Sequence, residues 1–262
     1  MTAIDAPATG LADGLRAWRR RRRISQLELA LRAGTTQRHV SFIERGRSQP
    51  GRAMIVRLAE ALEVPLRHRN ALLLAAGYAP AYPETALADD ALGPLRAALE
   101  RILDGHDPCP AVVIDRDGEM VSANAAFARL TGAAAQRLGA SATNLPRLLL
   151  HPDGLASDII NFPEWGWHVA DGVRRLNERD PSPRRAAVLD ELERLLPPRP
   201  RDPSPHHLGF AVPLRLRAPG GGELTLLTTL THFATAVDVT VAELTLEAFL
   251  PADAATASAL AH

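Results

Sequence analysis

The stretch SQLELALRAGTTQRHVSFIERGRSQP, Ser25 to Pro50, decides the fold of the first part of the chain. Glu28 follows Ser25 by three residues, which is the spacing of a capping box at the start of a helix. Gly34 suits the left-handed position that ends a helix, and Gly46 stops the helical pattern that follows. The stretch therefore predicts two short helices joined by a tight turn.

These two helices differ in how much apolar surface they offer. The inner face of the first is predicted to consist of Leu27, Ala30 and Leu31. The second is expected to run from about Thr36 to Glu44 and to turn only Val40 and Ile43 inward. A helix that is polar on nearly every other side needs a partner outside the core. The second helix is therefore the candidate for contact with another molecule.

Helical patterns flank this pair on both sides. One covers residues 11–23, one opens after Pro50-Gly51, and one spans about 66–76. The helix after Pro50-Gly51 keeps four apolar residues at helical spacing: Ile55, Leu58, Ala59 and Leu62. Five short helices in so few residues predict a compact bundle over residues 11–78.

The composition of the 262 residues is that of a globular protein with 46% hydrophobic residues. No apolar run approaches the roughly 18 residues that a membrane helix needs, and the N-terminus lacks a signal-peptide pattern. The single cysteine, Cys109, excludes an internal disulfide framework. We therefore expect a soluble, cytoplasmic protein.

Charge is divided unevenly along the chain, which contains no lysine. Residues 1–80 hold 14 Arg against 6 Asp and Glu, a balance of +8, and the remainder holds 16 Arg against 24 acids, a balance of −8. A GC-rich genome would explain arginine in place of lysine, but not why the excess lies in the first third. A basic front and an acidic back favour a module that faces nucleic acid.

Helix, tight turn and helix at this spacing form a helix-turn-helix, whose second helix enters the DNA major groove N-terminus first. Glutamine can bond adenine at two points and arginine can do the same to guanine. Gln37 and Arg38, with Thr36 before them, are therefore the predicted base readers. Three residues outside this helix are placed for phosphates: Gln26, Arg47 and Ser48. The alternative is that all of these are ordinary solvated helix faces.

The arginine run at residues 19–23 cannot all face one partner, because a helix has 3.6 residues per turn. Two or three of these side chains could reach phosphates, and the others are expected to be solvated or paired with acids.

Residues 25–50, with Arg19 and residues 58–62 in register, closely resemble the phage-repressor (XRE-type) helix-turn-helix family. The resemblance implies an ion pair between Arg19 and Glu44. Phe42 departs from the polar residue usual in the family, and we expect it to meet a thymine methyl group. The resemblance also implies DNA contacts from five residues: Gln26, Thr36, Gln37, Arg38 and His39.

The remainder of the chain predicts a mixed domain behind a linker at residues 79–91. A helix is expected over 92–103, and strands over 111–114 and 119–123 around Asp117-Gly118, a strong hairpin dipeptide. Asn124 is placed to cap the next helix. Residues 157–196 are helical in pattern with interruptions at Pro163 and Pro181, and the last 45 residues suggest two or three antiparallel strands. The predicted fold class is α+β, with two domains.

Residues 92–251 resemble the ligand-binding half of MmyB-like regulators, and the start of this segment resembles a PAS-type domain. Four pieces carry the resemblance: VVIDRDGEMVSANAAF, NLPRLLLHPDG, NFPEWGWHV and VDVTVAELTLEAFLPAD. The family implies a PAS-like sheet-and-helix shell around a small apolar ligand such as an acyl chain. It implies no particular molecule.

The residues alone make a thinner case for a pocket. Six residues are the main candidates for lining a ligand pocket: Val112, Ile114, Phe127, Leu148, Trp165 and Trp167. Val121, Leu130, Ile159 and Phe210 are further candidates, and each of the ten could equally be ordinary core. Two tryptophans beside a proline suit a lid, in which Pro163 interrupts the helix and Gly166 eases bending.

Catalytic chemistry is not predicted. Cys109 before a proline could ligate a haem iron, but one cysteine before a strand is more often buried and inert. The histidines His151, His168 and His206-His207 lack metal-site spacing, so no metal site is expected. No phosphate-binding glycine loop stands between a strand and a helix.

The sequence therefore predicts a regulator that binds double-stranded operator DNA as a homodimer and senses a small apolar ligand, with no other cofactor and no enzyme activity. Two alternatives stay open for the second part of the chain. One is a PAS-like sensor with haem or flavin, and the other is a domain used only for protein interaction or dimerisation.

Overall fold

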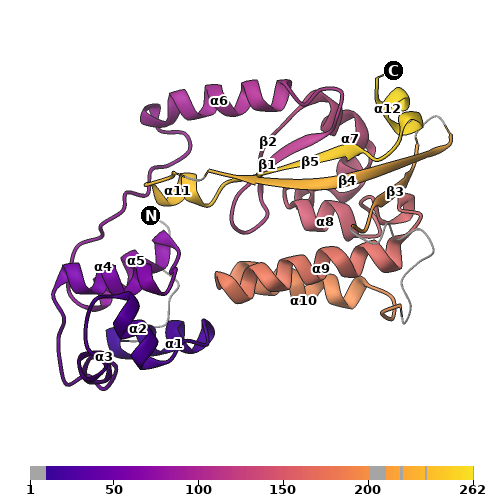
Figure 1. The fold of residues 1–262 in the computed structure, drawn as a ribbon. Coiled ribbons are helices and arrows are strands. Elements are labelled where there is room, and N and C mark those ends of the chain that lie inside the picture. The colour runs from indigo at the N-terminus through magenta and orange to yellow at the C-terminus, as the bar shows by residue number, and fades with distance from the viewer. Residues whose placement is uncertain (1–9, 201–210, 219–220, 234, 262) are drawn as a thin grey trace. The chain divides into compact units, whose positions relative to one another are not determined.

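The computed structural model describes residues 10–200, 211–218, 221–233 and 235–261. The chain divides into two compact units. The first unit comprises residues 1–85 together with 235–242, and the second unit comprises residues 86–234 and 243–262. Figure 1 traces both units along the chain.

The first unit contains the five helices that the sequence predicts. They are α1 (Leu11–Arg21), α2 (Gln26–Arg32), α3 (Gln37–Glu44), α4 (Arg52–Ala61) and α5 (Leu66–Ala75). Their shared core includes Leu15, Trp18, Val40, Ile43, Ile55, Leu58, Ala59 and Leu62. The expected inward faces of α3 and α4 are confirmed.

The predicted inner face of α2 is wrong for two of its three residues. Leu27 and Leu31 are 53% and 73% exposed, whereas Leu29 and Ala30 are fully buried. Residues four apart share a helix face, so burying Leu29 and its neighbours necessarily turns Leu27 and Leu31 to the outside.

One local rule ends the five helices α1 to α5. After the last turn of each, a residue with positive φ follows: Arg23, Gly34, Gly46, Glu63 and Gly77. In each case the next residue donates its backbone N–H to a carbonyl five positions earlier, as Arg47 does to Phe42 at 2.8 Å. This is the Schellman motif, which satisfies carbonyls that the helix end would otherwise leave unpaired. Arg23 and Glu63 are not glycines, so the left-handed backbone at these two positions is strained.

The first unit also holds residues 235–242, including the short helix α11 (Val239–Ala242). Asp238 is the anchor of this segment: its Oδ2 accepts the backbone N–H of Thr85 at 3.0 Å and the Thr85 hydroxyl at 2.7 Å. The Val239 N–H donates to the Pro83 carbonyl at 2.8 Å. The middle of the predicted linker is therefore tied to a segment that comes much later in the chain.

The second unit is built on a five-stranded antiparallel sheet of order β2-β1-β5-β4-β3. The strands are β1 (Ala111–Ile114), β2 (Met120–Ala123), β3 (Leu214–Arg217), β4 (Glu223–His232) and β5 (Thr245–Pro251). The helices are α6 (Gly93–Asp104), α7 (Ala125–Leu138), α8 (Leu145–Leu150), α9 (Phe162–Arg179), α10 (Pro183–Leu195) and α12 (Ala254–Leu260). Short 3₁₀ helices cover Asp90–Leu92, Gly139–Thr143 and Ala156–Asp158.

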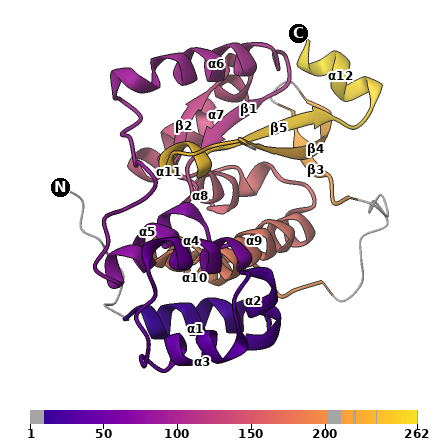
Figure 2. The same cartoon turned by 60° about the vertical axis from the view of Figure 1, so that its left-hand side comes forward.

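The two faces of this sheet are covered by different helices. Figures 1 and 2 show α6 on one side of the sheet and α8, α9 and α10 on the other. The outer core, on the α6 side, joins Leu99 and Leu103 to Val113 and Leu246. The inner core, on the other side, is larger and contains residues of β1, β3, β4 and β5 with α7, α8, α9 and α10. The expected β1–β2 hairpin and C-terminal strands are confirmed, as is the Asn124 cap, which accepts the Phe127 N–H at 2.9 Å.

Helix α9 departs from the predicted pattern at its start. Pro163 lies in the first turn of α9, where a missing N–H costs nothing, so the predicted interruption at Pro163 is wrong. Gly166 is buried, and a Cβ there would lie 2.5 Å from the Leu196 side chain. The glycine permits close packing rather than bending, which removes the physical basis of the predicted lid. The break at Pro181 is confirmed, because it separates α9 from α10.

Candidate functional site

Helix α3 presents its polar residues on the side away from the core. Thr36, Gln37 and Arg38 are exposed, while His39 and Phe42 are half-buried. Thr36 is the N-cap and accepts the His39 N–H at 3.1 Å, which leaves its hydroxyl hydrogen available as a donor. The side chain of Gln37 makes no hydrogen bond within the described part of the chain. The predicted base readers therefore lie together at the leading end of one helix.

Arg38 and Phe42 form a pair on this exposed surface. The Arg38 guanidinium lies 5.1 Å from the centre of the Phe42 ring, a cation–π distance. The ring thus holds the guanidinium near the helix rather than letting it extend freely. That contact was not expected from the sequence, although residues four apart on a helix are neighbours.

A buried ion pair fixes α3 against α1, as the resemblance implies. Arg19 donates to both carboxylate oxygens of Glu44, at 2.6 and 2.9 Å. Glu44 is 1% exposed, and the Gln26 amide donates to it at 2.7 Å. Burial alone would raise the pKa of Glu44, but the hydrogen bonds from Arg19 and Gln26 outweigh burial and lower it. One N–H of Gln26 is therefore committed inside the protein, and its role at a phosphate stays a prediction.

Much of the arginine run has structural partners. Arg19 pairs with Glu44, and Arg22 donates to the Leu62 and Glu63 carbonyls at 2.9 and 2.8 Å. The guanidinium groups of Arg21 and Arg22 lie over the Trp18 ring at 5.3 and 5.4 Å. The run thus stabilises the ends of α1 and α4, in line with the expectation that only part of it could reach phosphates.

The remaining predicted phosphate contacts lie just after α3. Arg47 is exposed and Ser48 is half-buried. The Arg47 backbone N–H is used inside the Schellman motif, so only its side chain is available to DNA. The exposed Arg47 side chain therefore lies in the segment that directly follows α3.

The six ligand-lining candidates of the second unit divide into two groups. Val112, Phe127, Leu148 and Trp165 are buried in the inner core. Ile114 packs against that core from a half-buried position. Of the further candidates, Ile159 belongs to the same core and Leu130 packs against it. Val121 is exposed and lies outside this core, and Phe210 lies outside the described residues.

Trp167 belongs to a different environment from Trp165. It packs against a small cluster of Ala170, Val173 and Leu189. Its indole N–H donates to the Pro197 carbonyl at 2.9 Å, and Arg199 lies 4.4 Å from the ring centre. Trp167 therefore bonds α9 to the segment after α10 and packs in a different cluster from Trp165.

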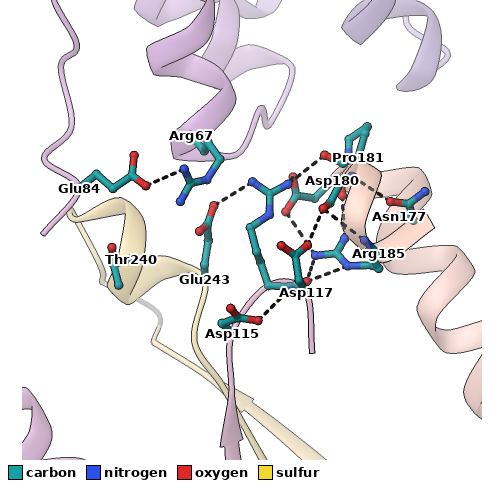
Figure 3. Close-up of polar contacts among 12 residues, drawn as sticks. Arg67, Glu84, Asp115, Asp117, Asn177, Asp180, Pro181, Arg185, Thr240 and Glu243 are labelled. Atoms are coloured by element: carbon teal, nitrogen blue, oxygen red, sulfur yellow. Dashed lines mark hydrogen bonds and ion pairs between the residues drawn. The ribbon is translucent and has the colours of Figure 1, made fainter. Parts of the chain in front are cut away.

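A polar junction that the sequence did not predict joins the β1–β2 turn to the α9–α10 turn (Figure 3). Arg185 is buried and donates to the Arg116 carbonyl through Nε at 2.7 Å and to the Asp180 carbonyl at 2.7 Å. Arg116 in turn contacts Asp180 at 3.1 Å and Glu243 at 3.3 Å. The Ser182 hydroxyl donates to Asp117. These partners are far apart in sequence, so no local pattern could have revealed them.

Cys109 and the histidines offer little metal chemistry. Burial, and then the nearby Asp107 carboxylate, raise the pKa of the Cys109 thiol, which opposes the thiolate that iron ligation needs. Within the described ranges no group of three or more His, Cys, Asp or Glu could hold a metal ion. His206-His207 lies outside those ranges.

Comparisons with known families agree with this geometry. Residues 95–262 match the family described as MmyB-like transcription regulator ligand binding domain, and residues 15–68 match the helix-turn-helix family. In the described part of the chain, no helix is both long and apolar enough to cross a membrane.

Two individual proteins show weaker likeness. An uncharacterized HTH-type transcriptional regulator, y4dL, of Sinorhizobium fredii (strain NBRC 101917 / NGR234), is 46% identical over 56 residues, which are 21% of this chain and 29% of that relative. A solved structure, described as an RNA-binding Light-Oxygen-Voltage Receptor, is 14% identical with a TM-score of 0.26 over 93% of this chain and 60% of that chain. A likeness at that TM-score carries no argument.

The fold and the site define a DNA-binding transcriptional regulator of the XRE helix-turn-helix class with a separate ligand-binding domain. More particularly, the chain belongs to the family of MmyB-like transcription regulators, because that family's ligand-binding domain matches most of its length.

Proposed function

We propose that this regulator reads a specific operator as a homodimer, and that its PAS-like second unit binds a small apolar molecule that changes its affinity for DNA. The observation that carries the DNA part is the leading end of α3. Gln37 and Arg38 are exposed there, and the guanidinium of Arg38 has the Phe42 ring as its neighbour. Such groups match the bidentate contacts that read adenine and guanine.

The homodimer follows from the geometry of DNA. One helix-turn-helix reads only a few base pairs, and regulators of this class gain specificity by binding two half-sites about 34 Å apart. Purified full-length protein should select from random DNA a palindromic site with that spacing. Native mass spectrometry of the complex should give two chains per site, and one chain per site would contradict the homodimer.

The apolar ligand is supported by the inner core of the second unit. Helices α7 to α10 cover one face of the sheet with leucine, phenylalanine and tryptophan side chains, and a chain buried among them would gain about 0.8 kcal/mol per CH₂ group. The strand order β2-β1-β5-β4-β3 supports the PAS-like interpretation.

The connection between β4 and β5 offers a route from ligand to DNA. Residues 235–242 belong to the first unit, where Asp238 holds them to Thr85. They are joined directly to β4 and β5, which contribute to the inner core. A ligand that shifts either strand would therefore pull on a segment packed against α5 of the first unit, provided that it favours one arrangement over the other.

Extraction of the purified protein with organic solvent, followed by mass spectrometry, should identify an apolar molecule. Titration of saturated acyl compounds into the full-length protein should show affinity rising with chain length up to a cut-off. A flat response with unchanged DNA affinity would leave the second unit as a dimerisation or docking domain. A visible absorbance band in the purified protein would favour haem or flavin instead.

A further inference from the structure

Glu247 is a charged residue on the inner face of the sheet, where apolar side chains dominate. It lies in β5, the central strand, and pairs in register with Val112 of β1 and Leu230 of β4. Directly paired residues of neighbouring strands point to the same face. Val112 belongs to the inner core, so the Glu247 side chain points to the inner face as well.

The row Val112, Glu247, Leu230 runs from the closed part of the inner face to an open part. Val112 is 0% exposed and Leu230 is 53% exposed, with Glu247 half-buried between them. The next pair along, Phe249 and Thr228, repeats this pattern, because Phe249 is buried and Thr228 is exposed. Glu247 therefore lies where the packed core opens toward solvent.

Among the residues that the structure describes, none bonds the Glu247 carboxylate. Within the described residues it makes no hydrogen bond or ion pair, whereas its neighbours do: Thr245 bonds the His232 ring at 3.1 Å and Thr229 is 3.4 Å from the Ala248 carbonyl. Its oxygens are not sealed from solvent. Burial nevertheless raises the pKa of Glu247 to about 7, which reflects a group poorly solvated by water and unaided by protein donors.

A carboxyl group in this position selects among ligands by their polar end. A second carboxylate would either repel it or compete with it for one proton. A neutral donor could bond it, but a cationic donor forms a hydrogen bond roughly twice as strong. The apolar neighbours Val112, Phe249 and Leu230 would meanwhile contact the body of the ligand.

We propose that Glu247 is the polar anchor of a ligand site on the inner face of the sheet, and that the ligand is an apolar molecule carrying an amino group rather than a free fatty acid. This inference rests on the proposed sensing function and specifies its ligand class.

The test uses three probes of equal chain length, decylamine, decanol and decanoate, titrated calorimetrically into the full-length protein near pH 7.5 and below their aggregation limits. Decylamine should bind the native protein about tenfold or more tighter than decanoate, since one charge-assisted contact is at stake. Glu247→Gln should abolish that preference while leaving decanol binding nearly unchanged, because the apolar contacts remain.

Glu100→Gln is the matched control. Glu100 is exposed on α6, so its replacement changes net charge by the same amount without touching the inner face, and the preference for decylamine should persist. A loss of preference in Glu100→Gln would mean that general attraction to an acidic domain, not Glu247, selects the amine, and would overturn the inference. A cooperative thermal transition at or above the native temperature, with unchanged near-ultraviolet dichroism, would show that Glu247→Gln is folded.

The outcomes separate the two proposals. If decanol and decanoate bind but decylamine binds no tighter, or if Glu247→Gln keeps the native preference, the head-group inference is wrong and apolar sensing stands. If none of the three probes binds, apolar sensing itself fails and the anchor with it.

Discussion

Glu44 of the first unit and Glu247 of the second are both carboxylates that lie against apolar cores, but they differ in their hydrogen-bond partners and in the direction of their pKa shift. Glu44 receives hydrogen bonds from Arg19 and Gln26, and these lower its pKa despite full burial. Glu247 receives no hydrogen bond from the described residues, and burial raises its pKa to about 7. Glu44 has its partners within the protein and fixes structure, whereas the described residues offer Glu247 no donor, and in our proposal a ligand supplies one.

The largest expected effect comes from Glu44→Ala. The variant strands the Arg19 guanidinium in a nearly dry site, so the free energy of unfolding of the first unit should fall by about 3–5 kcal/mol. Scanning calorimetry of the full-length protein measures it. Glu60→Ala is the control, because Glu60 is exposed and lies 3.5 Å from Arg69, a pair worth less than about 1 kcal/mol. Equal shifts in both variants would contradict the buried-pair interpretation.

Unlike Glu44→Ala, Glu247→Gln should raise the free energy of unfolding, and its effect should grow as the pH rises. A folded pKa of about 7 against an ordinary 4.5 means that the native state holds a proton that the unfolded chain has lost. Stability from this group therefore declines as pH rises from 4.5 to 7, by up to about 3 kcal/mol. Glutamine removes that loss, so the variant should unfold at a higher temperature than the native protein near pH 8 and at the same temperature near pH 4.

Glu44 gives the contrasting pH slope. Its pKa is lowered in the folded state, so its stabilisation is complete above the unfolded value and is lost as pH falls through the folded one. Unfolding followed from neutral to acid pH should thus show the first unit weakening below about pH 4.5. The same acidification should not weaken the contribution of Glu247. If the stabilities of both units changed with pH in the same way, the proposed difference between Glu44 and Glu247 would be wrong.

Arg38 represents a third case, an exposed charge whose proposed partner is DNA. Arg38→Ala should cost about 1–3 kcal/mol on the selected operator and relax specificity at one base position. Arg47→Ala should weaken binding to all sequences alike and reduce its salt dependence. Binding titrations against operator and random duplex measure both. If Arg38→Ala weakens both duplexes equally, Arg38 is a phosphate contact and not a base reader.

The smallest effect concerns the helix ends that distinguish the first unit. Glu63 has φ of 50° after α4, a backbone that glycine adopts without strain. Glu63→Gly should therefore raise the stability of the first unit by about 1 kcal/mol. Glu60→Gly, inside α4, should lower it by about 1 kcal/mol. Destabilisation by both glycines would mean that the Glu63 side chain contributes more than its backbone costs.

The sequence was most informative where structure is local. Caps, left-handed glycines and helical spacing act over three to five residues, and they predicted the five helices of the first unit and the exposed leading end of α3. In the first unit, the error at Leu27 and Leu31 of α2 arose because apolar residues occur on both faces of that short helix. Only packing against the other helices decides which face is buried.

The second unit shows the limit of the same reasoning. Its strands and the break between α9 and α10 follow from turn and proline signals, but its environments do not. Trp165 and Trp167, two residues apart and predicted as one lid, lie in different clusters because α9 is helical through both. A continuous helix rotates such neighbours by about 200°.

The sequence by itself thus determined the class of the protein, the helix-turn-helix and the polar residues exposed at the leading end of α3, because these depend on contacts between near neighbours in the chain. Tertiary structure decided which charges are satisfied. The register of β5 against β1 and β4 turns Glu247 toward the inner face without a donor, and the packing of α1 against α3 gives Glu44 both of its donors. Both residues are glutamates in the sequence. Only the distant residues brought against each one determine whether its carboxylate stabilises the fold or is left for a ligand.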